Sequence, residues 1–382
     1  MKKFLAITLA SVMTLGLMAC GGASGSGNAG AGSSDAAAQA DGTAAAGTEA
    51  SQTEAEPAES TGEAASDASA AGGDPTKADL VLKIGISTNE EDPRAIAANE
   101  FAQEVFEKTG GAVGAQVYPS GQLGGDADLI NSLALDSGTA DIIITDASNF
   151  ATYEPKMGIS ALPFQFADFD EAWAFMDSDV EKKAEEGLLS QNMRVLAHYC
   201  NGFRCVTNSK GPVESPDDMK GMLIRTPENP VIMATMSALG ANPQPLAFNE
   251  LYQALQQGTY DAQENPIPVI YNNNLYEVQG YLSVTNHIYS GMCFTIADST
   301  WNKLSADQQA IVAEAAANSA QKDRELNKEQ TESLVSSLEE AGMKINEPDL
   351  KPFADATASV LTDNASTYGS LLDDLAAWKA AR

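Results

Sequence analysis

LVLKIGI at residues 80–86 opens the part of the chain that decides the fold. Its nearly unbroken apolar character is typical of a strand buried on both faces of a sheet. An amphipathic segment at 96–108 follows and ends at two glycines, which predicts a helix. Further along, the pattern predicts a strand at 116–118, a helix at 126–135 and a strand at 140–146 (ADIIITD).

This β-α-β-α-β order predicts a parallel sheet with helices on its faces. Ligands of such sheets bind beyond the carboxyl ends of the strands. We therefore expect the loops at 87–92, 119–125 and 146–150 to share one rim.

A second α/β unit begins near residue 202. Its expected strands are 203–207, 223–226 and 260–263. Its expected helices are 231–239 and 250–257, the second capped by Asn249. Ser305 and Gln308 match a capping box that opens a helix reaching about Ala341. Roughly 35 helical residues span about 50 Å, enough to cross two domains.

The sequence thus predicts an α/β, two-lobed fold with a ligand cleft between the lobes and a long domain-spanning helix. Lobe I is expected at 79–201 and about 291–330, and lobe II at 202–290 and about 331–382. Two lobes joined in this way close around a ligand by hinge motion.

The N-terminus predicts export. A basic start and an apolar run at 5–17, too short to span a bilayer, indicate a signal peptide at 1–19. The segment LMACG at 17–21 matches a bacterial lipobox, with Cys20 as the lipidated first residue; an ordinary signal peptide that carries a cysteine is the alternative. Residues 21–78 contain no aromatic residue and no Val, Ile, Leu or Met, so we expect 20–78 to be a lipidated cysteine and a disordered tether.

Charge and motifs restrict the function. The formal net charge is −31, and residues 79–382 hold 19 basic and 44 acidic residues, which argues against a nucleic-acid partner. The His-Glu-x-x-His, Cys-x-x-Cys, Walker A and Gly-x-Ser-x-Gly motifs are missing, so no enzyme, metal or cofactor is expected. For Cys200, Cys205 and Cys293, a Cys200–Cys205 disulfide and three reduced buried thiols both fit.

One arginine stands out among only six. Arg225 ends an apolar strand and precedes Thr-Pro, so its guanidinium is well placed to meet an anion in a cleft, although a structural ion pair fits too. The segments around it follow a recognisable order: YPSGQLG at 118–124, LPF at 162–164, GFR at 202–204, PDDMKG at 216–221, IRTP at 224–227, LGA at 239–241, DAQENP at 261–266 and TNH at 285–287.

In this order, the segments resemble the solute-binding proteins of tripartite ATP-independent periplasmic (TRAP) transporters. The resemblance implies a periplasmic-binding-protein-like fold. It also implies that the protein captures a small organic acid and delivers it to TRAP permease subunits. A binding protein of an ATP-driven importer, a chemoreceptor or, as a weaker alternative, a surface-anchored enzyme stays open. We expect an extracytoplasmic protein that its lipid holds on the membrane.

The resemblance also assigns residues. It implies that Arg225 makes a bidentate salt bridge to the ligand carboxylate, which suits the planar guanidinium. Arg204 is expected to help hold the ligand or to brace the hinge. Asn265 is expected to bond the carboxylate or to form a turn before Pro266.

Four further positions carry alternatives. Phe248 either packs against the ligand or belongs to the core, and His287 either reaches the far end of the ligand or is a structural donor. Asp146 and Ser148 either contact the ligand from lobe I or cap a helix. The loop STNEED at 87–92 is acidic, which favours a monocarboxylate such as a sugar acid or hydroxy acid if one of its carboxylates faces the cleft.

Overall fold

The structure is a computed structural model that describes residues 73–382. The expected signal peptide, Cys20 and most of the expected tether lie outside the described residues. The end of the tether is ordered: η1 (Pro75–Lys77) is a short 3-10 helix whose Asp74 cap accepts a hydrogen bond from Thr76 N at 2.9 Å. It packs against β2, where Gly114 leaves room for the Pro75 carbonyl. The expectation of disorder up to residue 78 is therefore wrong for this helix.

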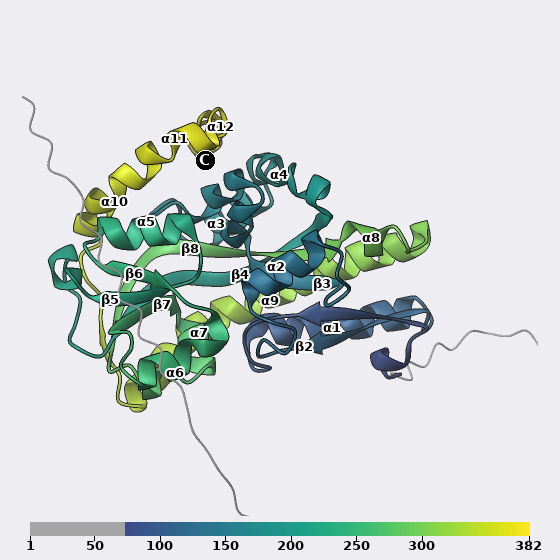
Figure 1. Cartoon of the computed structure of the whole chain (residues 1–382), viewed down its shortest axis with the longest axis horizontal. Helices are drawn as coiled ribbons and strands as arrows, with labels where there is room; N and C mark the ends of the chain where they lie inside the picture. Colours follow the sequence, from purple (N-terminus) through teal and green to yellow (C-terminus); the bar gives the residue numbers. More distant parts are fainter. Residues whose placement is uncertain (1–72) are drawn as a thin grey trace, which may run out of the picture. The chain divides into compact units, whose positions relative to one another are not determined.

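Lobe I begins with the predicted β-α-β-α-β unit. Strand β1 (Leu80–Gly85) pairs in parallel with β2 (Val113–Tyr118) and with β3 (Ile142–Asp146). Helices α1 (Pro93–Lys108) and α2 (Asp126–Ala134) connect these strands (Figure 1). Helix α1 starts earlier than predicted because Asp92 caps it and Pro93 suits its first turn.

Two long strands join the lobes. Strands β4 (Met193–Asn208) and β8 (Tyr281–Ala297) are antiparallel, and the sheet order is β2-β1-β3-β8-β4-β7-β5-β6, with β9 (Lys344–Asn346) beside β8. Strand β8 pairs with β3 of lobe I, and β4 pairs with β7 of lobe II. The sheet is therefore mixed, whereas the sequence predicted only a short strand at 203–207 and no β8.

Lobe II places Arg225 near the centre of its own small sheet. Strand β5 (Leu223–Thr226) lies between β6 (Asn242–Pro245) and β7 (Ala262–Pro266), all parallel. Helices α5 (Pro230–Ala238), α6 (Leu251–Gln256) and α7 (Ile267–Asn272) accompany them. Asn249 does not cap α6, contrary to expectation, because a 3-10 turn, η6 (Phe248–Glu250), runs directly into it.

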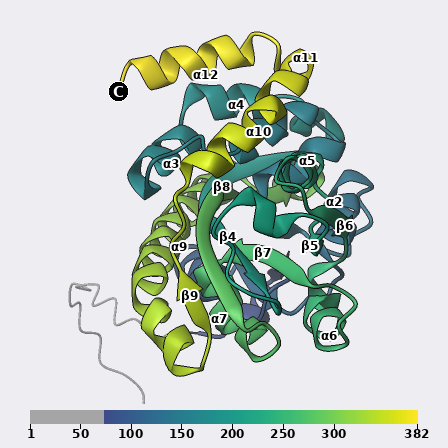
Figure 2. The ribbon, with the colours of Figure 1, turned by 90° about the vertical axis from the view of Figure 1, so that its left-hand side faces the viewer.

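Helix α9 (Ala306–Glu340) confirms the predicted long helix. The side chain of Ser305 caps its first turn, and the helix runs for 35 residues. It packs against α1 in lobe I, against β4, and against α7 in lobe II (Figure 2). The helix therefore packs against elements of both lobes.

The C-terminal helices also reach both lobes. Helix α10 (Lys351–Asp363) packs on α5, whereas α12 (Leu371–Ala380) packs on α4 (Asp179–Glu185) of lobe I (Figure 2). Cys200, Cys205 and Cys293 are buried and free, so the disulfide alternative is wrong. The remaining helices are α3 (Phe169–Met176), α8 (Asp298–Trp301), α11 (Ala365–Tyr368), η2 (Ala147–Thr152), η3 (Pro155–Ala161), η4 (Leu188–Gln191), η5 (Pro216–Met219) and η7 (Leu275–Glu277).

Candidate functional site

A cavity of about 670 Å³ lies between the lobes. Lobe I lines it with Asp126 at the start of α2 and with Asn149 on η2, and lobe II with Arg225 and Phe248. The same four residues also line a smaller cavity of about 30 Å³, so the two cavities meet at Arg225. Side chains that line only the smaller one include Arg94, Asp146, Asn201, Arg204 and Asn265.

Arg225 is a buried cation without a carboxylate partner. Its side chain donates from Nε (2.9 Å) and Nη2 (2.5 Å) to the carbonyl oxygen of Leu246, and its guanidinium lies 5.8 Å from the ring centroid of Phe248. Within residues 73–382 it forms no ion pair. Burial lowers its pKa to about 10, because the charged form has lost its water. A ligand anion would supply the missing partner.

Arg204 is neutralised within the protein. Its Nε lies 2.5 Å and its Nη2 2.8 Å from the two carboxylate oxygens of Glu264, and Nη2 also donates to Asn265 Oδ1 at 3.1 Å. Burial alone would raise the pKa of Glu264, but Arg204 lowers it to about 2. Arg204 therefore reaches the cavity wall with its charge already balanced.

Three more predicted residues lie near this pair. Asn265 lines the smaller cavity and donates to Gln263 Oε1 at 2.5 Å. Asp146 lines it as well, caps η2 through Ser148 N at 2.8 Å and accepts a hydrogen bond from Ser290 Oγ. Ser148 is fully buried between Asp146 and Asn229 and lines none of the described cavities.

Phe248 and His287 occupy different environments. Phe248 is partly exposed and lines both cavities, together with a third one of about 220 Å³. His287 is fully buried and lines none of them. Its Nε2 lies 3.3 Å from Glu264 Oε2, and its Nδ1 bonds Thr285 Oγ1 at 2.8 Å. Burial lowers the pKa of His287, and its imidazole contacts Glu264 away from the described cavities.

Asp126 is a cleft carboxylate that sequence reasoning missed, and Asp128, Glu228 and Glu250 also line the larger cavity. It begins α2, and its Oδ1 is buried without a hydrogen-bond partner in the described residues. The expected acidic loop behaves differently: Glu90 and Glu91 are exposed, and Asp92 pairs with Arg94 at 2.8 Å. A signal for Asp126 existed, because it directly follows the loop at 119–125, which was predicted to lie on the binding rim.

Comparison with known proteins decides the family. Residues 84–367 match the family described as bacterial extracellular solute-binding protein, family 7. The chain belongs to this family. Among the described residues of this family 7 protein, no helix is long and apolar enough to cross a membrane.

Several relatives are named for an acid or hold one in their solved structures. A 2,3-diketo-L-gulonate-binding periplasmic protein of Escherichia coli is 34% identical over 74% of this chain and 86% of its own length. A TRAP periplasmic solute-binding protein of Roseobacter denitrificans with bound L-galactonate is 33% identical, with a TM-score of 0.72 over 77% of this chain and 99% of that chain. A TRAP protein of Sulfurospirillum deleyianum with bound succinate is 28% identical, with a TM-score of 0.75 over 78% and 99%. These relatives are binding proteins, which supports a role outside catalysis.

Proposed function

We propose that this protein captures a small hydroxylated monocarboxylate, of the sugar-acid class, in the cleft between its lobes and delivers it to a TRAP permease. The observation that carries the proposal is Arg225, a buried cation that lines the cavity without a carboxylate partner in residues 73–382. Burying an uncompensated charge is costly, and a ligand carboxylate would remove that cost.

The clamp is organised before a ligand arrives. The Leu246 carbonyl fixes the plane of the Arg225 guanidinium, which leaves Nη1 free of a bond to Leu246. Glu264 holds Arg204 on the same cavity wall, and Asn265 bonds both Arg204 and Gln263. Groups fixed in this way lose little conformational freedom on binding, which favours affinity.

Asp126 supports the preference for hydroxyl groups. A ligand whose carboxylate meets Arg225 would present its other end to the lobe I side of the cavity, where Asp126 lies. The free Oδ1 of Asp126 accepts a hydrogen bond from a hydroxyl but repels a second carboxylate. Solved relatives hold either L-galactonate or succinate, and Asp126, with the other carboxylates that line the cavity, favours the first kind of ligand.

The site needs both lobes, which supports closure of lobe I on lobe II around the ligand. We take the lobes to be 79–201 with about 291–330, and 202–290 with about 331–382. We further propose that the chain is exported and that Cys20 carries the lipid anchor. The anchored protein then delivers its ligand to the permease at the outer face of the cytoplasmic membrane.

A thermal-shift screen tests the proposed ligand class. A ligand that binds only the folded protein adds about 2.7 kcal/mol of apparent stability when its concentration is 100 times its Kd. The unfolding midpoint rises as a result. We expect L-galactonate or a similar sugar acid to raise the midpoint, and succinate to leave it unchanged. A shift with neutral sugars and none with any carboxylate would contradict the proposal.

A further inference from the structure

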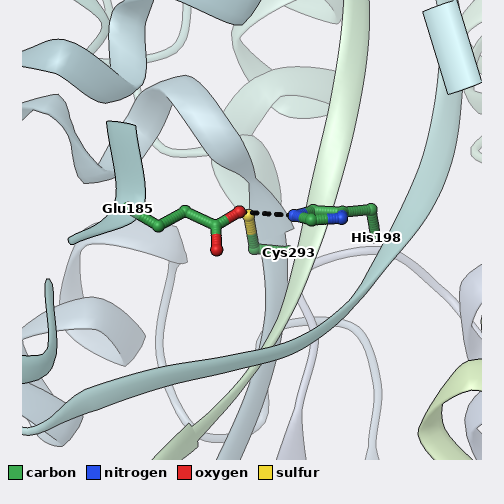
Figure 3. A group of neighbouring side chains, drawn as sticks. All are labelled: Glu185, His198 and Cys293. Carbon is green, nitrogen blue, oxygen red and sulfur yellow. Dashed lines mark hydrogen bonds and ion pairs between the residues drawn. The ribbon is translucent and has the colours of Figure 1, made fainter. Parts of the chain in front are cut away.

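A second group of polar side chains lies outside the ligand cleft. Glu185 ends α4, His198 lies on β4 and Cys293 lies on β8, directly opposite His198 in the antiparallel pair. One oxygen, nitrogen and sulfur atom of the three lie within 4.8 Å of one another (Figure 3). None of the three lines the described cavities. Three elements therefore converge on one point with three kinds of donor.

The imidazole of His198 is held from both sides. Its Nε2 lies 2.5 Å from Glu185 Oε1, and its Nδ1 lies 3.5 Å from Asp177 Oδ1. Arg324 fixes Asp177 by two bonds of 2.7 Å each. A histidine that binds a metal through one nitrogen commonly has a carboxylate at the other, which sets the orientation of the ring. Asp177 occupies that second position.

Glu181 provides an independent observation. It precedes Glu185 by four residues on α4, so the two side chains share one face of the helix. Glu181 is fully buried, and neither carboxylate oxygen has a hydrogen-bond partner within residues 73–382. A nearby cation would relieve the cost of this unpartnered group.

We propose that Glu185, His198 and Cys293 bind a divalent transition metal of the zinc class. Thiolate and imidazole ligands favour zinc over magnesium or calcium, and zinc is ordinarily four-coordinate. The fourth ligand is water or Glu181, whose carboxylate lies on the same helix face as Glu185. The ion ties α4 to β4 and β8 and so stabilises lobe I, at a site separate from the organic-acid cleft.

Proton exchange balances the charge of this step. The metal displaces one proton from the His198 imidazolium and one from the Cys293 thiol, and both protons leave to solvent. One divalent cation thus replaces two protons, and the net charge of the buried group is unchanged. With water as the fourth ligand, Asp177 and Arg324 keep their charges and Glu181 keeps its protonation state. With Glu181 as the fourth ligand, its carboxyl proton also leaves to solvent and the net charge of the group falls by one. Because protons compete with the metal, binding tightens as the pH rises.

Cobalt is the direct probe. We expect the full-length, metal-free protein to bind one equivalent of Co²⁺ and to show thiolate-to-cobalt absorption, which Zn²⁺ displaces. Cys293→Ser should abolish this absorption, whereas Cys200→Ser, which removes another buried thiol on the neighbouring strand, should keep it. Wild-type protein without the absorption, or Cys293→Ser with it, would overturn the proposal.

Asp177→Asn gives a second readout that does not remove a ligand. Loss of a carboxylate behind a metal-bound histidine typically weakens metal affinity about 10–100-fold. We expect such a loss in a Zn²⁺ titration followed by calorimetry, with the stoichiometry kept at one. Unchanged Zn²⁺ affinity in Asp177→Asn would contradict the role given to His198.

Discussion

Arg204 and Glu264 form a two-bonded ion pair in which both side chains are buried, at the wall of the ligand cleft. Arg225 lines the same cavity but, within residues 73–382, its side chain donates only to the Leu246 carbonyl. The protein thus satisfies one arginine internally, and in the proposed function the other meets the ligand. We therefore expect ligand binding to depend on the guanidinium of Arg225.

Removal of the Arg225 guanidinium should abolish binding without unfolding the protein. Loss of one partner of a desolvated charge pair costs about 2–5 kcal/mol of binding free energy. We expect Arg225→Ala to lose sugar-acid binding in calorimetry while its unfolding midpoint falls little. Arg194→Ala is the matched control, because Arg194 pairs with Asp298 outside the cleft. Wild-type affinity in Arg225→Ala would remove the basis of the proposed function.

Neutralising Asp126 should change ligand selectivity. In Asp126→Asn the repulsion of a second carboxylate is lost, and one strong acceptor for hydroxyl groups is weakened. The ratio of succinate to galactonate affinity should therefore rise, as measured by competition binding. Glu91→Gln removes the same charge from an exposed position of the neighbouring acidic loop and should leave the ratio unchanged. Equal ratios in the two variants would assign selectivity to other residues.

Glu264 should carry part of the acid sensitivity of the fold. Its pKa falls from the ordinary value of 4.5 to about 2 in the folded protein. Its stabilising contribution is therefore complete above the unfolded pKa and is lost as the pH falls from about 5 to about 2. Wild-type stability should drop more steeply over this range than that of Glu264→Gln, measured by urea unfolding.

The same variant should be less stable at neutral pH. Breaking a buried ion pair from one side costs about 3–5 kcal/mol, because Arg204 is left without its partner. Glu339→Gln, which changes an exposed glutamate on α9, is the matched control and should be neutral. A Glu264→Gln protein as stable as wild type at pH 7 would show that Arg204 finds another partner.

A glycine in β4, one of the two strands that join the lobes, should be required for full stability of the fold. Gly202 has φ of 114° and lies at an irregular register between β4 and β8. An added Cβ would approach Pro266 Cβ to 3.1 Å. Gly202→Ala should therefore cost about 1–3 kcal/mol, whereas Gly280→Ala, which meets open space, should cost little. Equal unfolding midpoints for the two variants would contradict this view.

Replacement of Cys20, which lies outside the described residues, tests the proposed lipid anchor. We expect wild-type protein in the membrane fraction of its own cells and Cys20→Ala in the soluble extracytoplasmic fraction. Stable anchoring requires covalent acyl chains, and the variant cannot accept them. Persistence of Cys20→Ala in the membrane fraction would show that Cys20 is not the anchor.

Local sequence patterns predicted much of lobe I and the long helix. Each strand or helix of lobe I has its own periodic pattern of apolar residues, which can be recognised within ten to twenty residues of sequence. Ser305 with Gln308 marks the start of α9 directly. The patterns failed at β4 and β8, because long strands buried along both lobes lack a simple alternation of polar and apolar residues. The antiparallel centre of the sheet was missed for this reason.

For the site, the sequence by itself determined that Arg225 would lie near the end of a strand, because the strand and its Pro-containing turn are local features. Only the tertiary structure decided which arginine is left without a carboxylate. The register of β4 against β7 sets Val206 opposite Glu264 and so brings Arg204 and Glu264, 60 residues apart, into contact. Such pairing depends on long-range strand register, which no neighbouring residues encode. The placement of Asp126 opposite Arg225 likewise depends on how the two lobes meet.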